Sequence, residues 1–324
     1  MSATLAPAAA PAAMPTLTRT WWFTQPMMRG EEVFLAQRLL NERAGAGLKP
    51  DGLFGAATQG AVKAFQRRRN LVEDGVLGPV TWAALVGAAQ PALRSGVAAV
   101  LDGATLAALQ QPHSRYPDSV TWRLTRDGLE VAGTLDAPSA AEAAMAERVL
   151  SEYADAIVTA SVRFPVPAEL VVATICTESS GKPRARRLEP GADLEDPERT
   201  PRRVSMGLMR TLLSTAREAL GDETLTLAAL ENPSTSIRAG MAYISRQGRS
   251  TRFDPPLVAC AYNAGSVRYQ GAAANRWRMA QYPIGTAKHA DRFVRFFNGA
   301  MRAVTKAGPG AIADPGVTFV ELLS

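Results

Sequence analysis

The chain has 324 residues, of which 47% are hydrophobic, and its formal net charge of +6 suits an anionic polymer, whether nucleic acid or bacterial cell wall. No segment approaches the about 18 consecutive apolar residues of a membrane-spanning helix, so we expect two or three domains without a membrane span. Two cysteines and two histidines, in neither CxxC nor HxxxH spacing, exclude a disulfide framework and predict neither a metal site nor a cofactor.

The first 20 residues, "MSATLAPAAAPAAMPTLTRT", are rich in alanine and proline. They lack a basic segment followed by an apolar one, so they do not read as a signal peptide, and we expect a flexible tail over 1–20. A protein that works outside the cytoplasm would then need a route other than ordinary secretion.

An internal repeat follows, because "DGLFGAAT" (51–58) and "DGVLGPVT" (74–81) share the pattern D-G-x-x-G-x-x-T. An Asp-Gly pair predicts a tight turn, since glycine tolerates a positive φ, and we expect Thr58 and Thr81 to cap the helices that follow. With the amphipathic helix expected over 31–42, the repeat predicts a small three-helix domain over residues 21–88.

Residues 29–87, which hold both copies, closely resemble the peptidoglycan-binding domain found beside many cell-wall hydrolases. The resemblance implies a three-helix module that holds peptidoglycan in a shallow groove. A three-helix spacer without a ligand is the alternative. The arginines at 67–69 are interpreted as a solvated helix face, because no interleaved aromatic residues favour stacking on bases, and we expect no nucleic-acid partner.

Residues 89–140 are expected to form a connector that contains a β-hairpin. Apolar residues alternate on both sides of an Asp-Gly turn in "VTWRLTRDGLEVAG" (120–133). A lone hairpin is marginal in water, so we expect Trp122 to pack on a neighbouring domain.

Residues 141–308 read as helical, and within them the apolar run of "ATICTESSGKP" (173–183) ends on Glu178. Pro167 suits the first turn of this helix and Gly181 its C-terminal cap. A helix C-terminus disfavours an anion by only roughly 0.3 to 1 kcal/mol, so apolar burial would have to supply most of any large rise in the pKa of Glu178. Residues 309–324 are expected to form a C-terminal tail.

Two further blocks follow, "SMGLMR" (205–210) and "ACAYNAG" (259–265). Alone, they read as a helix start with core methionines and as an ordinary helix end. Together with "TESSG" they give three blocks in the order E-S, G-L-M, A-Y-N-A-G, which closely resemble the soluble lytic transglycosylase catalytic domain of the goose-type lysozyme superfamily.

This resemblance implies that Glu178 is the single catalytic acid, which protonates the glycosidic oxygen between N-acetylmuramic acid and N-acetylglucosamine. Ser179 would contact the adjacent sugar, Tyr262 would lie close to Glu178, and Asn263 would help to hold that wall. Arg210 departs from the family's usual glutamine. A guanidinium cannot accept a hydrogen bond, although it could meet a peptide or lactyl carboxylate. The remaining residues implied in the cleft lining are Gly207, Leu208 and Met209.

The mechanism has two alternatives. A lytic transglycosylase needs one carboxyl group and leaves a 1,6-anhydro end, which the Tyr and Gly-Leu-Met blocks favour. A hydrolytic muramidase needs a second carboxylate to activate water, and Glu189 is the candidate, because Pro190 and Gly191 predict a turn just after it. A protein of another class, an inactive wall-binding or structural component of a phage particle, is the third reading.

The sequence thus predicts a mainly α protein: a three-helix peptidoglycan-binding domain, a hairpin-containing connector over 89–140, and a helical lysozyme-like transglycosylase domain over 141–308. Cys176 and Cys260 are interpreted as small core residues, and His289 as structural rather than catalytic. The expected partners are peptidoglycan glycan strands and components of a phage or phage-like particle. We expect synthesis in the cytoplasm and action on the bacterial cell wall, through phage lysis machinery or as a virion component.

Overall fold

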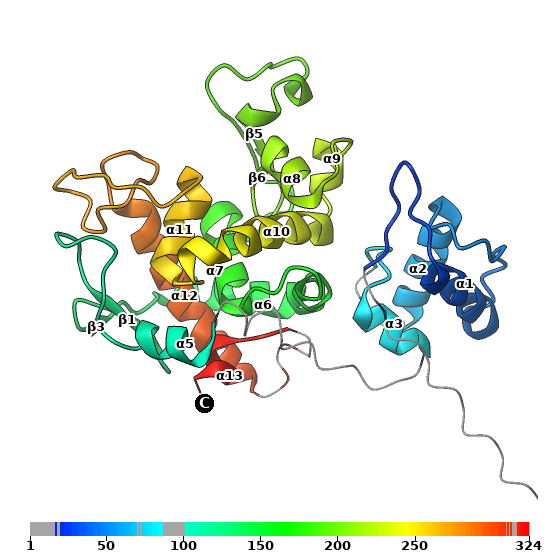
Figure 1. The fold of residues 1–324 in the computed structure, drawn as a ribbon, viewed down its shortest axis with the longest axis horizontal. Coiled ribbons are helices and arrows are strands. Elements are labelled where there is room, and N and C mark those ends of the chain that lie inside the picture. Colours follow the sequence, from blue (N-terminus) through cyan, green and yellow to red (C-terminus); the bar gives the residue numbers. More distant parts are fainter. Residues whose placement is uncertain are drawn as a thin grey trace, which may run out of the picture.

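The computed structural model of the chain describes residue 17 and residues 20–69, 71, 73–86, 101–308, 310, 312 and 316–323. Helices dominate this part of the chain and its sheets are small, which confirms the prediction of a mainly α protein. Figure 1 shows a small helical module, coloured blue to cyan, beside a larger helical body. None of the described helices combines the length and apolar character needed to cross a membrane. The predicted tail over 1–20 lies almost wholly outside the described residues.

The N-terminal module consists of α1 (Glu31–Ala44), α2 (Ala56–Arg68) and α3 (Pro79–Val86). An isolated antiparallel bridge between Trp21 and Leu77 joins the segment before α1 to the segment before α3. The module has a hydrophobic core of its own, formed by Trp21, Val33, Ala36, Leu39, Leu40, Phe54, Val62, Phe65, Leu77, Trp82, Leu85 and Val86. A separate core of this kind is what the predicted three-helix domain requires.

Each copy of the sequence repeat is organised by a buried glutamine of the helix before it. The Nε2 atom of Gln37 donates to Asp51 Oδ1 at 2.9 Å and to Thr58 Oγ1 at 3.0 Å, and its Oε1 atom accepts from the amide of Gly52. The second copy repeats this arrangement with Gln66, Asp74, Thr81 and Gly75. The glutamine therefore fixes the turn and the next helix at once.

The helix caps predicted for Thr58 and Thr81 are wrong. Helix α2 begins at Ala56 after Gly55, so Thr58 already lies inside it, and Thr81 likewise lies inside α3. Their hydroxyl groups accept the glutamine hydrogen bonds instead. The predicted turns are confirmed, with Gly52 at φ 74° and Gly75 at φ 73°.

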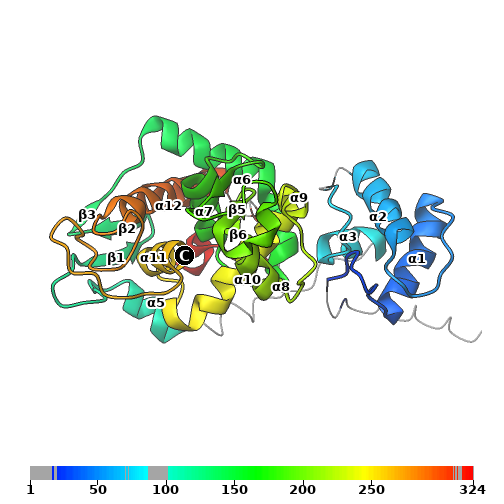
Figure 2. The ribbon, with the colours of Figure 1, turned by 90° about the horizontal axis from the view of Figure 1, so that it is seen from above.

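The second copy of the repeat faces the larger body. A Cβ atom on Gly78 would come within 2.7 Å of Thr159 Cγ2, so only glycine fits at this contact. The guanidinium of Arg238 lies 4.4 Å from the ring centre of Trp22, and its charge faces the nearly buried Asp74. In Figure 2, α3 lies on the side of the module that is turned toward the larger body.

The described part of the predicted connector, residues 101–140, is packed onto the larger body. It contains α5 (Gly103–Leu109) and the antiparallel strands β1 (Trp122–Thr125), β2 (Gly128–Val131) and β3 (Thr134–Leu135). The hairpin is confirmed, and β3 extends it by a strand that the sequence did not indicate. Trp122 is 1% exposed, donates from Nε1 to Asp254 Oδ1 at 2.9 Å and has its ring centre 5.3 Å from that of Trp277, as its predicted packing requires.

The larger body is built around α7 (Ala168–Ser179), with α6 (Ala140–Ser161) and α12 (Lys288–Ala307) packed along it. Helix α7 is apolar on nearly every side, which is typical of a central helix. Cys176 of α7 and Cys260 are buried free thiols, which agrees with their interpretation as core residues. The other helices of this body before its C-terminal segment are α8 (Leu213–Leu220), α9 (Leu227–Leu230), α10 (Pro233–Thr251) and α11 (Pro255–Ala264).

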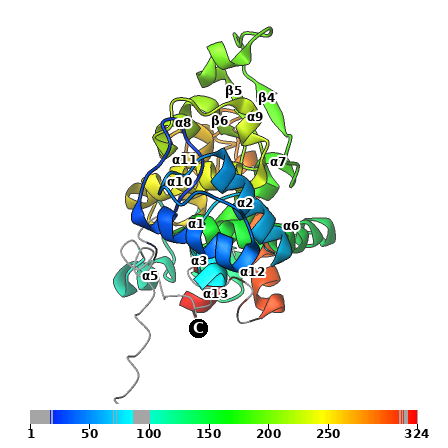
Figure 3. The same ribbon diagram turned by 90° about the vertical axis from the view of Figure 1, so that its right-hand side faces the viewer.

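A second small sheet has the order β4 (Arg186–Leu188), β5 (Val204–Met206), β6 (Thr211–Leu212). The charged segment between β4 and β5 contains two short 3₁₀ turns, Pro197–Arg199 and Pro201–Arg203. Figure 3 shows this segment projecting at the top of the molecule, beyond α8 and α10.

The segment predicted as a C-terminal tail contains the short helix α13 (Phe319–Leu322). Phe319 is fully buried, with its ring centre 5.6 Å from that of Phe297. Its backbone amide donates to Glu169 Oε2 at 2.9 Å, and the amide of Val320 donates to the other oxygen of the same carboxyl group. Residues 316–323 are therefore packed, because their apolar side chains complete the core at the start of α7.

Candidate active site

Glu178 is the one residue of α7 that is not buried, and its side chain is 13% exposed. The helix ends at Ser179, after which Ser180 (φ 55°) and Gly181 (φ 74°) both adopt left-handed backbone conformations. Such a pair turns the chain sharply at a helix C-terminus. The carboxyl group thus lies at the partly exposed C-terminal end of an otherwise buried helix.

Two side chains flank the Glu178 carboxyl group without making a short hydrogen bond to it. Arg210 Nη1 lies 3.8 Å from Oε2, and His289 Nε2 lies 3.8 Å from Oε1. Burial raises the pKa of Glu178 to about 7, against the opposing positive charges of Arg210, Arg292 and Arg187. The carboxyl group is therefore poised to hold or release a proton near neutral pH.

His289, at the start of α12, is a neighbour of Glu178 that the sequence did not indicate. Burial and the nearby charges of Arg292 and Arg210 lower the pKa of its imidazole to about 4. A hydrogen bond to the backbone of Ala259 raises this pKa, but by less than the other effects lower it. His289 is thus neutral at pH 7 and adds no charge beside the carboxyl group.

Tyr262, at the end of α11, links two of the sequence blocks. Its hydroxyl donates to the carbonyl oxygen of Met209 at 2.9 Å and forms a hydrogen bond with Thr211 Oγ1 at 2.8 Å. Burial raises the pKa of the phenol, and the negative charge of the nearby Glu178 raises it further. Tyr243 of α10 packs on it, with ring centres 5.4 Å apart.

The Gly-Leu-Met block lies beneath the surface. A Cβ atom on Gly207, whose φ is 91°, would come within 2.2 Å of the carbonyl oxygen of Leu230, so the turn approaches α9 more closely than any side chain permits. Leu208 and Met209 are fully buried, and Met209 packs on Gly240 of α10. This packing fixes the position of Arg210, the next residue of the turn.

Ser179 is also turned inward. Its side chain is buried, and its hydroxyl donates to the carbonyl oxygen of Ile175 at 3.0 Å and accepts from the amide of Gly181 at 3.2 Å. The sugar contact implied for Ser179 stays a prediction, since its hydroxyl is engaged within the end of α7.

A cleft of about 470 Å³ opens at Glu178. Charged residues of the β4–β6 segment lie along it, and tyrosines from α10, α11 and the loop after α11 also line it. Glu189 is one of the lining residues and pairs with Arg187, with Nε and Oε1 2.9 Å apart. The lining residues are Glu178, Arg187, Glu189, Arg202, Ser205, Arg210, Thr211, Leu212, Thr215, Tyr243, Tyr262, Asn263, Ala264, Gly265 and Tyr282.

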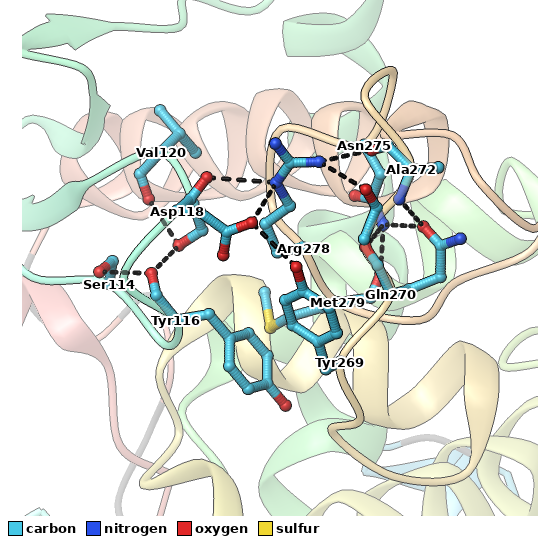
Figure 4. A network of polar contacts seen from close by, with 12 residues as sticks. Ser114, Tyr116, Asp118, Val120, Tyr269, Gln270, Ala272, Asn275, Arg278 and Met279 are labelled. Carbon is cyan, nitrogen blue, oxygen red and sulfur yellow. Dashed lines mark hydrogen bonds and ion pairs between the residues drawn. The ribbon is translucent and has the colours of Figure 1, made fainter.

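Asn263 positions the loop that brings Tyr282 to the cleft. Its Oδ1 atom accepts from the amide of Tyr282 at 2.5 Å. Figure 4 shows an earlier part of the same loop, where Arg278 lies between the loop backbone and Asp118 of the connector, with Nε and Oδ2 3.0 Å apart. Tyr269 donates to the same carboxylate at 2.9 Å. The connector therefore braces one wall of the cleft.

The sequence identified Glu178, Arg210, Tyr262, Asn263 and Glu189, and the structure brings all five to one cleft. The sequence did not indicate several other residues that line the cleft. Isolated tyrosines and arginines carry no local signal of a site, because only the packing of α10 and of the β4–β6 segment brings them together. These additional residues include Arg187, Arg202, Thr211, Tyr243 and Tyr282. Within the described residues, no group of three or more His, Cys, Asp or Glu side chains is arranged to hold a metal ion.

Two family models match the chain. The putative peptidoglycan binding domain matches residues 29–85, and the transglycosylase SLT domain matches residues 155–282. A solved structure described as the crystal structure of Burkholderia AP3 phage endolysin is 19% identical, with 88% of this chain and 99% of that chain covered and a TM-score of 0.21. A comparison with curated proteins finds no match. The chain therefore contains a transglycosylase SLT domain that follows a putative peptidoglycan binding domain, and the SLT domain indicates an enzyme that acts on peptidoglycan.

Proposed function

We propose that the protein is a lytic transglycosylase that cleaves the β-1,4 bond between N-acetylmuramic acid and N-acetylglucosamine, with Glu178 as its acid and its base. The position of Glu178 carries this proposal. It is the one residue of α7 that is not buried, it opens on a cleft, and its pKa is raised to about 7. A carboxyl group of this kind keeps a proton near neutral pH and can donate it.

The proposed reaction returns the enzyme to its starting state. Glu178 gives its proton to the glycosidic oxygen while the bond from that oxygen to C1 of the muramyl residue breaks. The C6 hydroxyl of the same residue then bonds to C1, and the Glu178 carboxylate takes the hydroxyl proton. The product carries a 1,6-anhydro end, and one carboxyl group serves both steps.

The other site residues would shape and bind the glycan. We propose that Tyr262 and Asn263 form one substrate-facing wall, since both line the cleft. Ser179, Gly207, Leu208 and Met209 would act from beneath it, by holding the end of α7 and the turn before Arg210.

A hydrolytic muramidase is the second candidate, because Glu189 lines the same cleft. It pairs with Arg187, with Nε and Oε1 2.9 Å apart, and a second carboxyl group in the cleft is what an inverting hydrolase needs to activate water. Mass spectrometry of digested peptidoglycan separates the two mechanisms. We expect anhydro-muropeptides. Reducing products heavier by one water, lost in Glu189→Gln, would assign hydrolysis with Glu189 as the base.

Zymography on purified cell wall tests whether the site is active at all. We expect clearing by the wild type and a loss of at least about tenfold in Glu178→Gln, because the amide matches the carboxyl in shape but cannot donate a proton as an acid. Wall binding and the circular dichroism spectrum should be unchanged. Wild-type protein that binds but never clears the wall would instead support an inactive wall-binding or structural component of a phage particle.

We place the proposed action at the bacterial cell wall, since residues 29–85 match a putative peptidoglycan binding domain. Delivery through phage lysis machinery or as part of a particle is a further proposal, with components of a phage or phage-like particle as partners. Proteomic detection of the chain in purified particles would support the virion role, and detection only in lysates would support the lysis role.

A further inference from the structure

Three arginines from three different elements converge on the C-terminal end of α7. Arg210 Nη1 donates to the carbonyl oxygen of Glu178 at 2.9 Å, Arg292 Nη2 to that of Cys176 at 3.3 Å, and Arg148 Nη2 to that of Ser180 at 3.2 Å. The last carbonyl groups of a helix lack partners within the helix and carry partial negative charge. The three cations therefore complete this end of the helix and offset its charge.

Arg210 differs from the other two, because the same Nη1 atom also lies 3.8 Å from the Glu178 carboxylate. Its side chain is 21% exposed, and its Nε atom is buried without a hydrogen-bond partner among the described residues. Its backbone has φ 44°, a left-handed conformation that a residue with a side chain adopts only at a cost. The fold thus holds this arginine at Glu178 despite local strain.

Three arginines act on the charge of Glu178, and Arg210 is the one whose guanidinium lies within 4 Å of the carboxyl group among the described residues. From α12 come Arg292 and His289, and His289 is neutral at pH 7 because its pKa is lowered to about 4. From α11 comes the uncharged Tyr262, whose hydroxyl is bonded to the turn before Arg210. From β4 comes Arg187, whose charge is shared with Glu189.

We propose that Arg210 is a positioning residue, which holds the end of α7 and stabilises the carboxylate form of Glu178. The catalytic part of this inference rests on the proposed function of Glu178. When Glu178 gives its proton to the glycosidic oxygen, a negative charge forms beside Arg210. The guanidinium lowers the cost of that charge and keeps the carboxylate in place until it takes the C6 hydroxyl proton.

The test compares three substitutions of Arg210, which all retain an unbranched side chain. Arg210→Lys keeps the charge, Arg210→Gln keeps hydrogen-bond donors without the charge, and Arg210→Met keeps neither. Arg246→Met is the matched control, because Arg246 pairs with Glu218 on the surface and does not line the cleft. Circular dichroism confirms that each variant folds.

The first readout is the pKa of Glu178 in the full chain without substrate, from ¹³C NMR of carboxyl-labelled glutamate, with Glu178→Gln used for assignment. An opposite charge within about 4 to 6 Å lowers a carboxyl pKa by about 1 to 3 units. We therefore expect the pKa to rise by about one unit in Arg210→Gln and Arg210→Met. Arg210→Lys and Arg246→Met should stay close to the wild type.

The second readout is the pH dependence of cleavage of soluble peptidoglycan fragments. We expect the alkaline limb to move upward with the pKa in the Gln and Met variants, while kcat falls and KM changes little. An unchanged Glu178 pKa, or a rise in KM alone, would overturn the inference, and the latter would make Arg210 a ligand of a substrate carboxylate. A shift in Arg246→Met equal to that in Arg210→Met would overturn it as well. The NMR titration decides the electrostatic role even if the wild type cleaves nothing, a result that would contradict only the proposed function.

Discussion

The Tyr262 hydroxyl donates a hydrogen bond to the Met209 carbonyl oxygen at 2.9 Å, and so ties the end of α11 to the turn that presents Arg210. Tyr262 and Met209 come from two sequence blocks about fifty residues apart. The bond fixes the distance between the tyrosine wall of the cleft and the turn that faces Glu178.

Replacement of Tyr262 by phenylalanine should lower both stability and activity. The change leaves the Met209 carbonyl and the Thr211 hydroxyl without this partner, and an unpaired buried polar group costs about 1 to 3 kcal/mol. We expect a decrease of this size in the free energy of unfolding, from urea titration, and a loss of about tenfold in kcat, since small displacements of catalytic groups are costly. Tyr243→Phe is the comparison variant, because the Tyr243 hydroxyl forms hydrogen bonds with Gln247 and, at 3.5 Å, with the carbonyl oxygen of Gly265, and does not hold the turn before Arg210. Equal losses in the two variants would contradict a special role for the Tyr262 bond.

The rate of peptidoglycan cleavage should be governed by the proton on Glu178. Burial raises the pKa of this group to about 7, and an acid must be protonated to act, so the rate should be level below about pH 6 and fall by about tenfold per pH unit above the pKa. Release of soluble fragments from labelled peptidoglycan at constant ionic strength measures this dependence. A rate that stays level up to pH 9 would show that Glu178 does not supply the proton.

The buried carboxyl group of Glu169 should make the fold less stable as pH rises. Burial raises its pKa from 4.5 to about 7, so between these values the folded chain binds more protons than the unfolded chain. Its contribution to the free energy of unfolding is present below pH 4.5 and is lost as pH rises through about 7, in total about 3 kcal/mol. Urea titrations at several pH values should show a shallower decline in Glu169→Gln. The remaining slope should come largely from Glu178, whose pKa is raised in the same direction. An unchanged slope would contradict the assignment to Glu169.

The N-terminal module should bind peptidoglycan by itself. It has a hydrophobic core of its own, so a fragment of residues 1–90 should fold alone. Because residues 29–85 match a putative peptidoglycan binding domain, we expect the folded fragment to sediment with insoluble peptidoglycan at physiological salt. Deletion of the same residues should weaken lysis without abolishing it, because the module raises the local concentration of the catalytic domain and leaves its chemistry unchanged. The fragment with Phe65→Asp, which disrupts that core, is the control. A folded wild-type fragment that stays in the supernatant would make the module a spacer.

Local features of the fold were predictable from the sequence. The Asp-Gly turns at Gly52 and Gly75, the hairpin that begins at Trp122 and the helix that ends beside Glu178 each depend on a few adjacent residues. Backbone freedom at glycine and the alternation of apolar residues are properties of short segments, so they are readable without the fold. The misassigned caps at Thr58 and Thr81 show the limit of such patterns, because both hydroxyl groups bind a glutamine from another helix.

By itself, the sequence indicated the helical class and the module order through periodicity and turns, and the resemblance of its ordered motifs to a known catalytic domain made Glu178 the candidate acid. The tertiary structure decided which groups surround that acid. His289 is 111 positions away in the chain and Arg210 is 32, yet each lies 3.8 Å from its carboxyl group. A residue's place in the sequence sets its helix face or turn, whereas contacts across the chain depend on how whole elements pack. The raised pKa of Glu178 is therefore a property of the assembled helices.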